Sequence, residues 1–274
     1  MSMLRPRAGM LLFLALALGH AHAATPNATK TRTEIAARFA DYGHAGAWLI
    51  QREGDKAHVA YGETLAGKPQ PPASTFKVML ALIALETGVL RSADEIVPWD
   101  GRNYADHPEW QADMALRQAM RTSSESYFRV LADRIGRERL AAWVTRVGYG
   151  NGRIGPKAVS AWHDGVLTVT AQQQLAFIDR VRRGNLPFKP ATLATVKAVM
   201  LEREADGRRI YGKTGTHFKD DGQPGVGWWI GWEEGKGRAT SFVLEVELKT
   251  LDSRDKRVAL GERLLAEEHA MPAR

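Results

Sequence analysis

Apolar and polar residues alternate with the period of a β-strand near both ends of the chain. Residues 47–51 and 58–62 flank the turn formers Gly54 and Asp55, and this pattern predicts a β-hairpin. A helical pattern closes the chain at about 253–268. Three further alternating segments predict strands at 208–214, 225–233 and 239–248.

The middle of the chain has the three-to-four-residue apolar spacing of helices. Residues 77–88 are apolar on nearly every side and end at Gly88, which predicts a buried helix. Thr170 and Gln173 form a capping box, and Gly184 ends the helix that this box begins. The remaining segments predict helices at 114–120, 126–135, 137–147, 170–183 and 191–201. Strands, a block of helices and strands again indicate one compact α+β unit.

The buried helix begins with a motif that can carry chemistry, Ser74-Thr75-Phe76-Lys77, after Pro71 and Pro72. Free backbone N–H groups at a helix start favour developing negative charge, and Lys77 lies one turn from Ser74 on the same face. Burial lowers the pKa of a lysine, so that it can act as base for a serine nucleophile. The alternative is a serine N-cap beside a lysine that extends to solvent. Lys213-Thr214-Gly215 favours the first interpretation, because an S-x-x-K with a distal K-T-G forms an acyl-transfer site.

The start of the chain has the features of a secretory signal peptide over residues 1–23. Arg5 and Arg7 precede an apolar run at 8–19 and the cleavage signal Ala21-His22-Ala23. We therefore expect a soluble protein exported to a bacterial periplasm, without a membrane anchor. The chain has no cysteine, which excludes disulfides. Its net charge is +7, but the basic residues are interleaved with acids, so no nucleic-acid partner is expected.

Further segments occur in the order and spacing of a known family. They include Trp99-Asp100-Gly101, Leu131-Ala132-Asp133-Arg134-Ile135-Gly136, Tyr149-Gly150-Asn151 and Gly227-Trp228-Trp229-Ile230-Gly231-Trp232. With the serine and lysine motifs, they resemble the class D (oxacillinase-type) β-lactamases over most of the chain. The resemblance implies a serine β-lactamase/penicillin-binding-protein-like α+β fold, in which terminal helices flank an antiparallel sheet and a helical domain is inserted. The implied β-lactamase domain spans 24–274, with an α/β part at about 24–68 and 205–274 and a helical part at about 69–204.

The resemblance also implies the roles of the site residues. Ser74 is the nucleophile, Lys77 is carbamylated by carbon dioxide and serves as general base, and Ser123 relays protons. The backbone N–H groups of Ser74 and Thr216 form the oxyanion hole. The residues implied to bind the substrate carboxylate are Lys213, Thr214, Gly215 and Arg257, and the implied supporting residues are Trp162, Tyr149 and Asn151. No metal or organic cofactor is implied.

Several of these residues have a plainer alternative. Lys213 is otherwise a solvated strand lysine, and Trp162, expected to hold the carbamate through its N–H, is otherwise a core aromatic. Arg254 competes with Arg257 for the carboxylate, and either is otherwise a surface charge. The histidines have no metal-ligand spacing, which argues against a zinc enzyme.

The motif that contains Ser123 departs from the family pattern. The family has Ser-x-Val where this chain has Ser123-Ser124-Glu125. A Glu125 carboxylate in the pocket would hold Lys77 as an ammonium and oppose its carbamylation. Alternatively, Glu125 is a solvated acid at a helix start.

Three functions therefore remain open. The first is hydrolysis of a small-molecule β-lactam through an acyl-serine. The second is a penicillin-binding sensor that is acylated with little turnover, and the third is a D,D-peptidase, in which Tyr149-Gly150-Asn151 would not be expected. The sequence determines neither the range of β-lactams accepted nor the oligomeric state.

Overall fold

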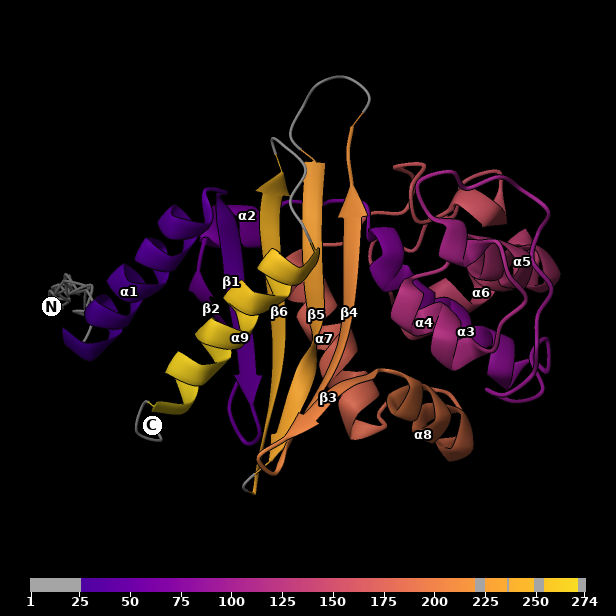
Figure 1. Cartoon of the computed structure of the whole chain (residues 1–274). Helices are drawn as coiled ribbons and strands as arrows, with labels where there is room; N and C mark the ends of the chain where they lie inside the picture. Colours follow the sequence, from indigo (N-terminus) through magenta and orange to yellow (C-terminus); the bar gives the residue numbers. More distant parts are fainter. Residues whose placement is uncertain (1–25, 220–224, 236, 249–253, 271–274) are drawn as a thin grey trace, which may run out of the picture.

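A six-stranded antiparallel sheet forms the centre of the structure (Figure 1). The structure is a computed structural model and describes residues 26–219, 225–235, 237–248 and 254–270. The strand order is β2-β1-β6-β5-β4-β3. In chain order the elements are α1 (Pro26–Tyr42), β1 (Gly46–Arg52), β2 (His58–Tyr61), α2 (Glu63–Ala66), η1 (Ala73–Phe76), α3 (Lys77–Glu86), η2 (Pro108–Trp110), α4 (Leu116–Thr122), α5 (Glu125–Ile135), α6 (Arg137–Val147), η3 (Ala158–Ser160), α7 (Ala171–Arg183), α8 (Pro190–Val199), β3 (Leu201–Ala205), β4 (Arg208–His217), β5 (Gly225–Gly235), β6 (Arg238–Leu248) and α9 (Arg254–Ala270).

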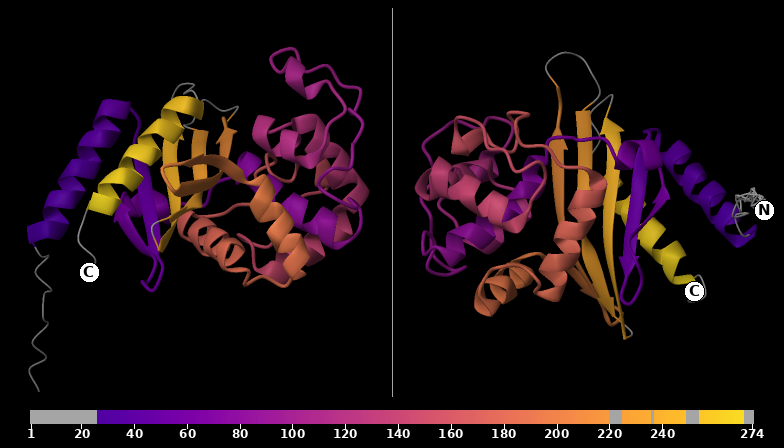
Figure 2. Two further views of the ribbon diagram at one scale, coloured as in Figure 1. Left: turned by 60° about the horizontal axis from the view of Figure 1, so that its bottom comes forward. Right: turned by 180° about the vertical axis from the view of Figure 1, so that it is seen from behind.

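Helices α1 and α9 contact each other and cover one face of the sheet (Figure 1). The two faces are separated by the alternation of side chains along each strand. On β5, for example, Trp229 packs toward α1 and α9, while its neighbours Trp228 and Ile230 join the core on the other face. The view from behind shows α7 lying along that second face, where it contacts β1, β5 and β6 (Figure 2).

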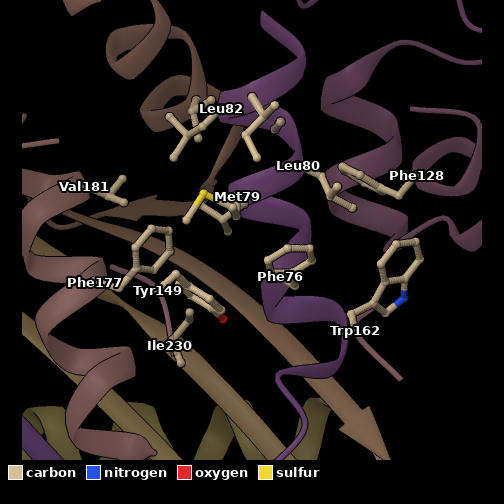
Figure 3. Close-up of a cluster of buried hydrophobic side chains, with 14 of the residues drawn as sticks. Phe76, Met79, Leu80, Leu82, Phe128, Tyr149, Trp162, Phe177, Val181 and Ile230 are labelled. Carbon is tan, nitrogen blue, oxygen red and sulfur yellow. The ribbon is translucent and has the colours of Figure 1, made fainter. Parts of the chain in front are cut away.

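The buried helix α3 lies at the centre of the helical part, where it contacts α5 and α8. All of its residues from Lys77 to Ala84 are buried. Figure 3 shows the side chains around it: Phe128 comes from α5, Tyr149 follows α6, and Phe177 and Val181 come from α7. The short turn η1, which leads into α3, contacts β4 and β5. This packing fixes the start of α3 against the sheet.

Most of the predicted elements are confirmed. The hairpin forms between β1 and β2, and helix α7 begins with the capping box of Thr170 and Gln173. Gly184 ends α7 with a φ of 68°, a left-handed conformation that favours glycine. The α+β fold is the one predicted from the order of the elements.

The end of the predicted helix at 191–201 is wrong. Helix α8 stops at Val199, and Leu201 begins strand β3. All five residues of β3 are exposed, so this edge strand has no apolar alternation that could reveal it. The predicted boundary between a helical part and an α/β part, at 204–205, falls inside β3. Moreover, α7 lies within the predicted helical part but packs on the sheet.

Among the described residues, none of the helices has the length and apolar character needed to cross a bilayer. The predicted signal peptide at 1–23 lies outside the described residues.

Candidate active site

Ser74 lies in the turn η1, which ends directly before Lys77, the first residue of α3. The α-helix itself begins at Lys77, as predicted, and the turn η1 before it carries Ser74. Ser74 is half-buried, whereas Lys77 is completely buried. The backbone therefore places a partly accessible hydroxyl one turn before a buried amine.

The backbone around Ser74 is held in an unusual conformation. Ala73 has a φ of 48°, which disfavours residues with a Cβ, and its N–H donates to the carbonyl oxygen of Trp162 at 3.0 Å. Strand β4 approaches from the other side at Gly215. A Cβ on Gly215 would lie 3.1 Å from the carbonyl oxygen of Pro72 and 3.2 Å from the Ser74 nitrogen. The glycine of the K-T-G motif therefore lets β4 pass beside the Ser74 backbone.

Ser123 occupies the junction between α4 and α5 with a φ of 55°. Its carbonyl oxygen accepts a hydrogen bond from Lys77 Nζ at 2.7 Å, and its hydroxyl accepts one from Lys213 Nζ at 2.9 Å. Lys77 Nζ lies 3.5 Å from the same hydroxyl. Ser123 thus joins the two lysines of the predicted site.

Glu125 turns its carboxylate into this site. Its Oε2 lies 3.1 Å from Lys77 Nζ and accepts a hydrogen bond from Trp162 Nε1 at 3.2 Å. His163 Nε2 lies 3.9 Å from the same oxygen. The alternative of a solvated acid at the start of α5 is wrong, because the carboxylate pairs with the buried lysine.

The two lysines and the carboxylate shift one another's pKa values. Burial lowers the pKa of Lys77, and Glu125 partly offsets this effect. Burial also lowers the pKa of Lys213 well below its usual value, and the charge of Lys77 lowers it further. Burial opposes the charge on Glu125, but the attraction of Lys77 and His163 outweighs it and lowers the pKa of Glu125 to about 2. Glu125 is therefore ionised at neutral pH.

Aromatic rings close the site around Lys77. Its Nζ lies 5.7 Å from the ring centroids of both Trp110 and Phe128. Figure 3 shows Phe128 and Trp162 beside the start of α3. Trp110, Phe128 and His163 are not among the residues predicted from the sequence. Trp110 lies in the short turn η2, in a segment without periodicity, and His163 had only its position next to Trp162 as a signal.

Lys213 and Thr214 lie on β4. Lys213 is buried and also donates to the carbonyl oxygen of Thr214 at 2.9 Å. The interpretation of Lys213 as a solvated strand lysine is therefore wrong. The hydroxyl of Thr214 accepts a hydrogen bond from Arg254 Nε at 3.3 Å.

Arg257 and Arg254 differ in burial and partners. Arg257 is 1% exposed, and its Nη1 donates to the carbonyl oxygen of Gly215 at 2.6 Å. Its Nη2 donates to the hydroxyl of Thr216 at 3.1 Å. Arg254 is exposed and pairs with Glu202 at 2.9 Å. Arg257 is thus built into the end of β4, whereas Arg254 lies on its surface.

Tyr149 and Asn151 lie outside the cluster formed by the two lysines, Ser123 and Glu125. The hydroxyl of buried Tyr149 donates to Gln174 Oε1 at 3.2 Å, and Gln174 Nε2 donates to the hydroxyl of Thr75 at 2.7 Å. This chain of hydrogen bonds fixes η1 from behind. Asn151 donates to the carbonyl oxygen of Val166 at 2.8 Å and does not contact the lysines.

In the part of the chain that the structure describes, histidine, aspartate and glutamate side chains form no cluster of three or more that could hold a metal ion. The polar groups at the site are two amines, a carboxylate, hydroxyls and backbone N–H groups, which suit acyl transfer to a serine.

Comparison with protein-family profiles matches residues 16–265 to the penicillin binding protein transpeptidase domain. Among curated proteins, the probable β-lactamase YbxI of Bacillus subtilis is 34% identical over 187 residues, which cover 68% of each chain. The β-lactamase OXA-20 of Pseudomonas aeruginosa is 30% identical over 270 residues, which cover 96% of this chain and 97% of the relative.

Solved structures agree with these similarities. The class D β-lactamase YbXI from Nostoc superposes with a TM-score of 0.81 at 31% identity, over 86% of this chain and 99% of that one. The class D β-lactamase from Bacillus subtilis superposes with a TM-score of 0.77 at 30% identity, over 87% and 97%.

Proposed function

Because this chain belongs to the class D β-lactamases and is a serine hydrolase of that family, we propose that it hydrolyses β-lactams through an acyl intermediate on Ser74. The meeting of Lys77, one turn from Ser74, and Lys213 at Ser123 supports this proposal most directly. These residues come from η1, α3, β4 and the α4–α5 junction. Burying two amines beside one serine costs free energy, and the secondary structure of these segments does not require it.

The proposed reaction has two steps. In acylation the hydroxyl oxygen of Ser74 bonds to the β-lactam carbonyl carbon and the ring C–N bond breaks. The Ser74 proton is relayed through Lys77 and Ser123 to the leaving nitrogen. In deacylation water adds to the acyl carbon, the bond to Ser74 breaks, and a proton returns to the serine oxygen.

The backbone N–H groups of Ser74 and Thr216 would stabilise the oxyanion in both steps. The close approach of Gly215 to the Ser74 nitrogen supports this assignment, because it brings the end of β4 beside η1. Lys213 and Arg257, both basic residues at this end of β4, would bind the substrate carboxylate.

We propose that Glu125 opposes the carbamylation of Lys77. Only the neutral amine reacts with carbon dioxide, and burial favours that form. The Glu125 carboxylate at 3.1 Å favours the ammonium instead. We therefore propose that Lys77 is largely unmodified while Glu125 is present. We also propose export to the periplasm, on the basis of the signal sequence at residues 1–23.

The same ion pair favours a second candidate function, that of a penicillin-binding protein that is acylated with little turnover. If Lys77 is the only base available and is held as an ammonium, the acyl-enzyme would persist. Steady-state release of hydrolysed β-lactam distinguishes the two candidates, because this second function requires one adduct per protein and almost no release.

Intact-mass spectrometry after mixing with a penicillin tests the main proposal. The wild-type protein should gain one penicillin mass, and Ser74→Ala should gain none. Ser92→Ala is the matched control, because Ser92 is exposed on a turn away from the site. An adduct that persists in Ser74→Ala would exclude Ser74 as the nucleophile.

A further inference from the structure

Two donors from separate parts of the fold hold one oxygen of Glu125. Lys77 Nζ from α3 lies 3.1 Å from Oε2 and Trp162 Nε1, from the segment after η3, donates to it at 3.2 Å, while His163 Nε2 lies farther away at 3.9 Å. The other oxygen, Oε1, receives none of these contacts, and the side chain remains 17% exposed. One oxygen is therefore fixed by the protein, and the other is left to accept a hydrogen bond from water.

We infer that Glu125 is the general base that activates water for deacylation, in place of a carbamylated Lys77. This inference rests on the proposed acyl-serine chemistry. The Glu125 carboxylate pairs with Lys77, which lies one turn from Ser74. It is therefore a suitable proton acceptor for water that attacks the acyl group. The N–H of Trp162, expected to hold a carbamate on Lys77, instead binds the carboxylate of Glu125.

The proton balance of this step is closed within the site. Oε1 of Glu125 takes a proton from water as the water oxygen bonds to the acyl carbon. The bond between that carbon and the Ser74 oxygen breaks, and the Lys77 ammonium gives one proton to the serine oxygen. The protonated Glu125 then gives its proton to the neutral Lys77 amine, which restores the ion pair. Ser74 and the Glu125 carboxylate are both regenerated, and no carbon dioxide is consumed or needed.

The charges around Glu125 support its role as general base and limit the rate of deacylation. Glu125 is ionised at neutral pH, so the acceptor form is the one present. The same donors also make it a weak base, and general-base catalysis slows as the base becomes weaker. We therefore expect deacylation to be slower than acylation, and a burst of product before the steady state.

The effect of replacing Glu125 has opposite signs under the two possible roles. If Glu125 only blocks carbamylation, its removal frees Lys77 and accelerates deacylation. If Glu125 is the base, its removal slows deacylation until another base is supplied. Glu125→Gln keeps the size and the hydrogen-bond acceptor for Trp162 but cannot accept a proton. Glu125→Val restores the Ser-x-Val pattern and lets Lys77 react with carbon dioxide.

The experiment measures acylation and deacylation separately, with a chromogenic cephalosporin in buffer freed of carbon dioxide and again with added bicarbonate. Wild-type turnover should be the same in both buffers, without a carbamate signal in carbon-13 NMR. Glu125→Gln should still form the Ser74 adduct but should deacylate about 100-fold more slowly without bicarbonate. Glu125→Val should deacylate slowly without bicarbonate and recover with it, together with a carbamate signal.

Glu138→Gln is the matched control, because Glu138 lies in the first turn of α6, as Glu125 lies in the first turn of α5, but Glu138 is exposed. It should deacylate at the wild-type rate in both buffers. Continued adduct formation in the Glu125 variants shows that they fold and that the acyl-serine proposal holds. Faster or unchanged deacylation of Glu125→Gln without bicarbonate, or a bicarbonate-dependent wild type, would overturn the role of Glu125 as base. Absence of any adduct in the wild type would instead overturn the proposed function.

Discussion

The amine of Lys213 donates a hydrogen bond to the hydroxyl of Ser123 at 2.9 Å, across 90 positions of the sequence. The hydroxyl of Ser123 can pass a proton on only if it accepts one at the same time, and the two lysines supply such donors. The left-handed backbone of Ser123 turns its carbonyl oxygen to Lys77 and its hydroxyl to Lys213. Local strain at this junction thus coincides with the contact between two distant segments.

Ser123→Ala should slow acylation about 100-fold, because the relay to the leaving nitrogen loses its hydroxyl. The pre-steady-state rate of adduct formation measures this effect. Ser124→Ala is the matched comparison, since the Ser124 hydroxyl caps α5 by accepting from the Tyr127 N–H at 3.2 Å. It should lower the free energy of unfolding by about 1 kcal/mol and slow acylation much less. Equal acylation rates for the two variants would argue against a relay through Ser123.

Arg257→Ala should mainly raise KM for an anionic β-lactam, as expected when binding is lost equally from ground and transition states. It should also lower the melting temperature, because the buried carbonyl oxygens of Gly215 and Trp228 lose their donor. Arg254→Ala should change both quantities less, since Arg254 is exposed. A larger rise in KM for Arg254→Ala than for Arg257→Ala would assign the carboxylate to Arg254 instead.

Glu245→Gln should stabilise the protein at alkaline pH. Glu245 is buried on β6, its Oε2 has no hydrogen-bond partner, and burial raises its pKa to about 8. Between the unfolded pKa of about 4.5 and the folded pKa of about 8, the unfolded chain has lost this proton and the folded protein keeps it. The free energy of unfolding therefore falls as the pH rises through this window, by on the order of 5 kcal/mol.

Thermal unfolding at pH 5 and at pH 8.5 measures this effect. Glu245→Gln should raise the melting temperature by several degrees at pH 8.5 and by less at pH 5. Glu247→Gln is the control, because Glu247 is more exposed and pairs with Lys68 at 3.3 Å. An equal gain at both pH values would show that the charge of Glu245 is not the cause.

Much of the fold follows from local patterns. The hairpin, the buried helix α3 and the capping box of α7 are encoded by turn formers, apolar runs and a cap within a few residues of one another. Strand β3 was missed because it is an exposed edge strand, held in place by β4 rather than by its own apolar pattern. The partner is close in sequence, since Ala205 pairs with Arg208, but the exposed side chains of β3 give no apolar pattern that separates this strand from the end of α8.

The sequence by itself determined the main motifs of the candidate site, because Ser74 and Lys77 lie one helical turn apart, and K-T-G and Tyr149-Gly150-Asn151 are contiguous motifs. Only the tertiary structure decided the direction of the Glu125 carboxylate. A first-turn acid is equally compatible with solvent and with a buried partner, since helical periodicity does not determine which neighbour packs against it. The choice depends on Lys77 and Trp162, which are brought to Glu125 from distant parts of the chain.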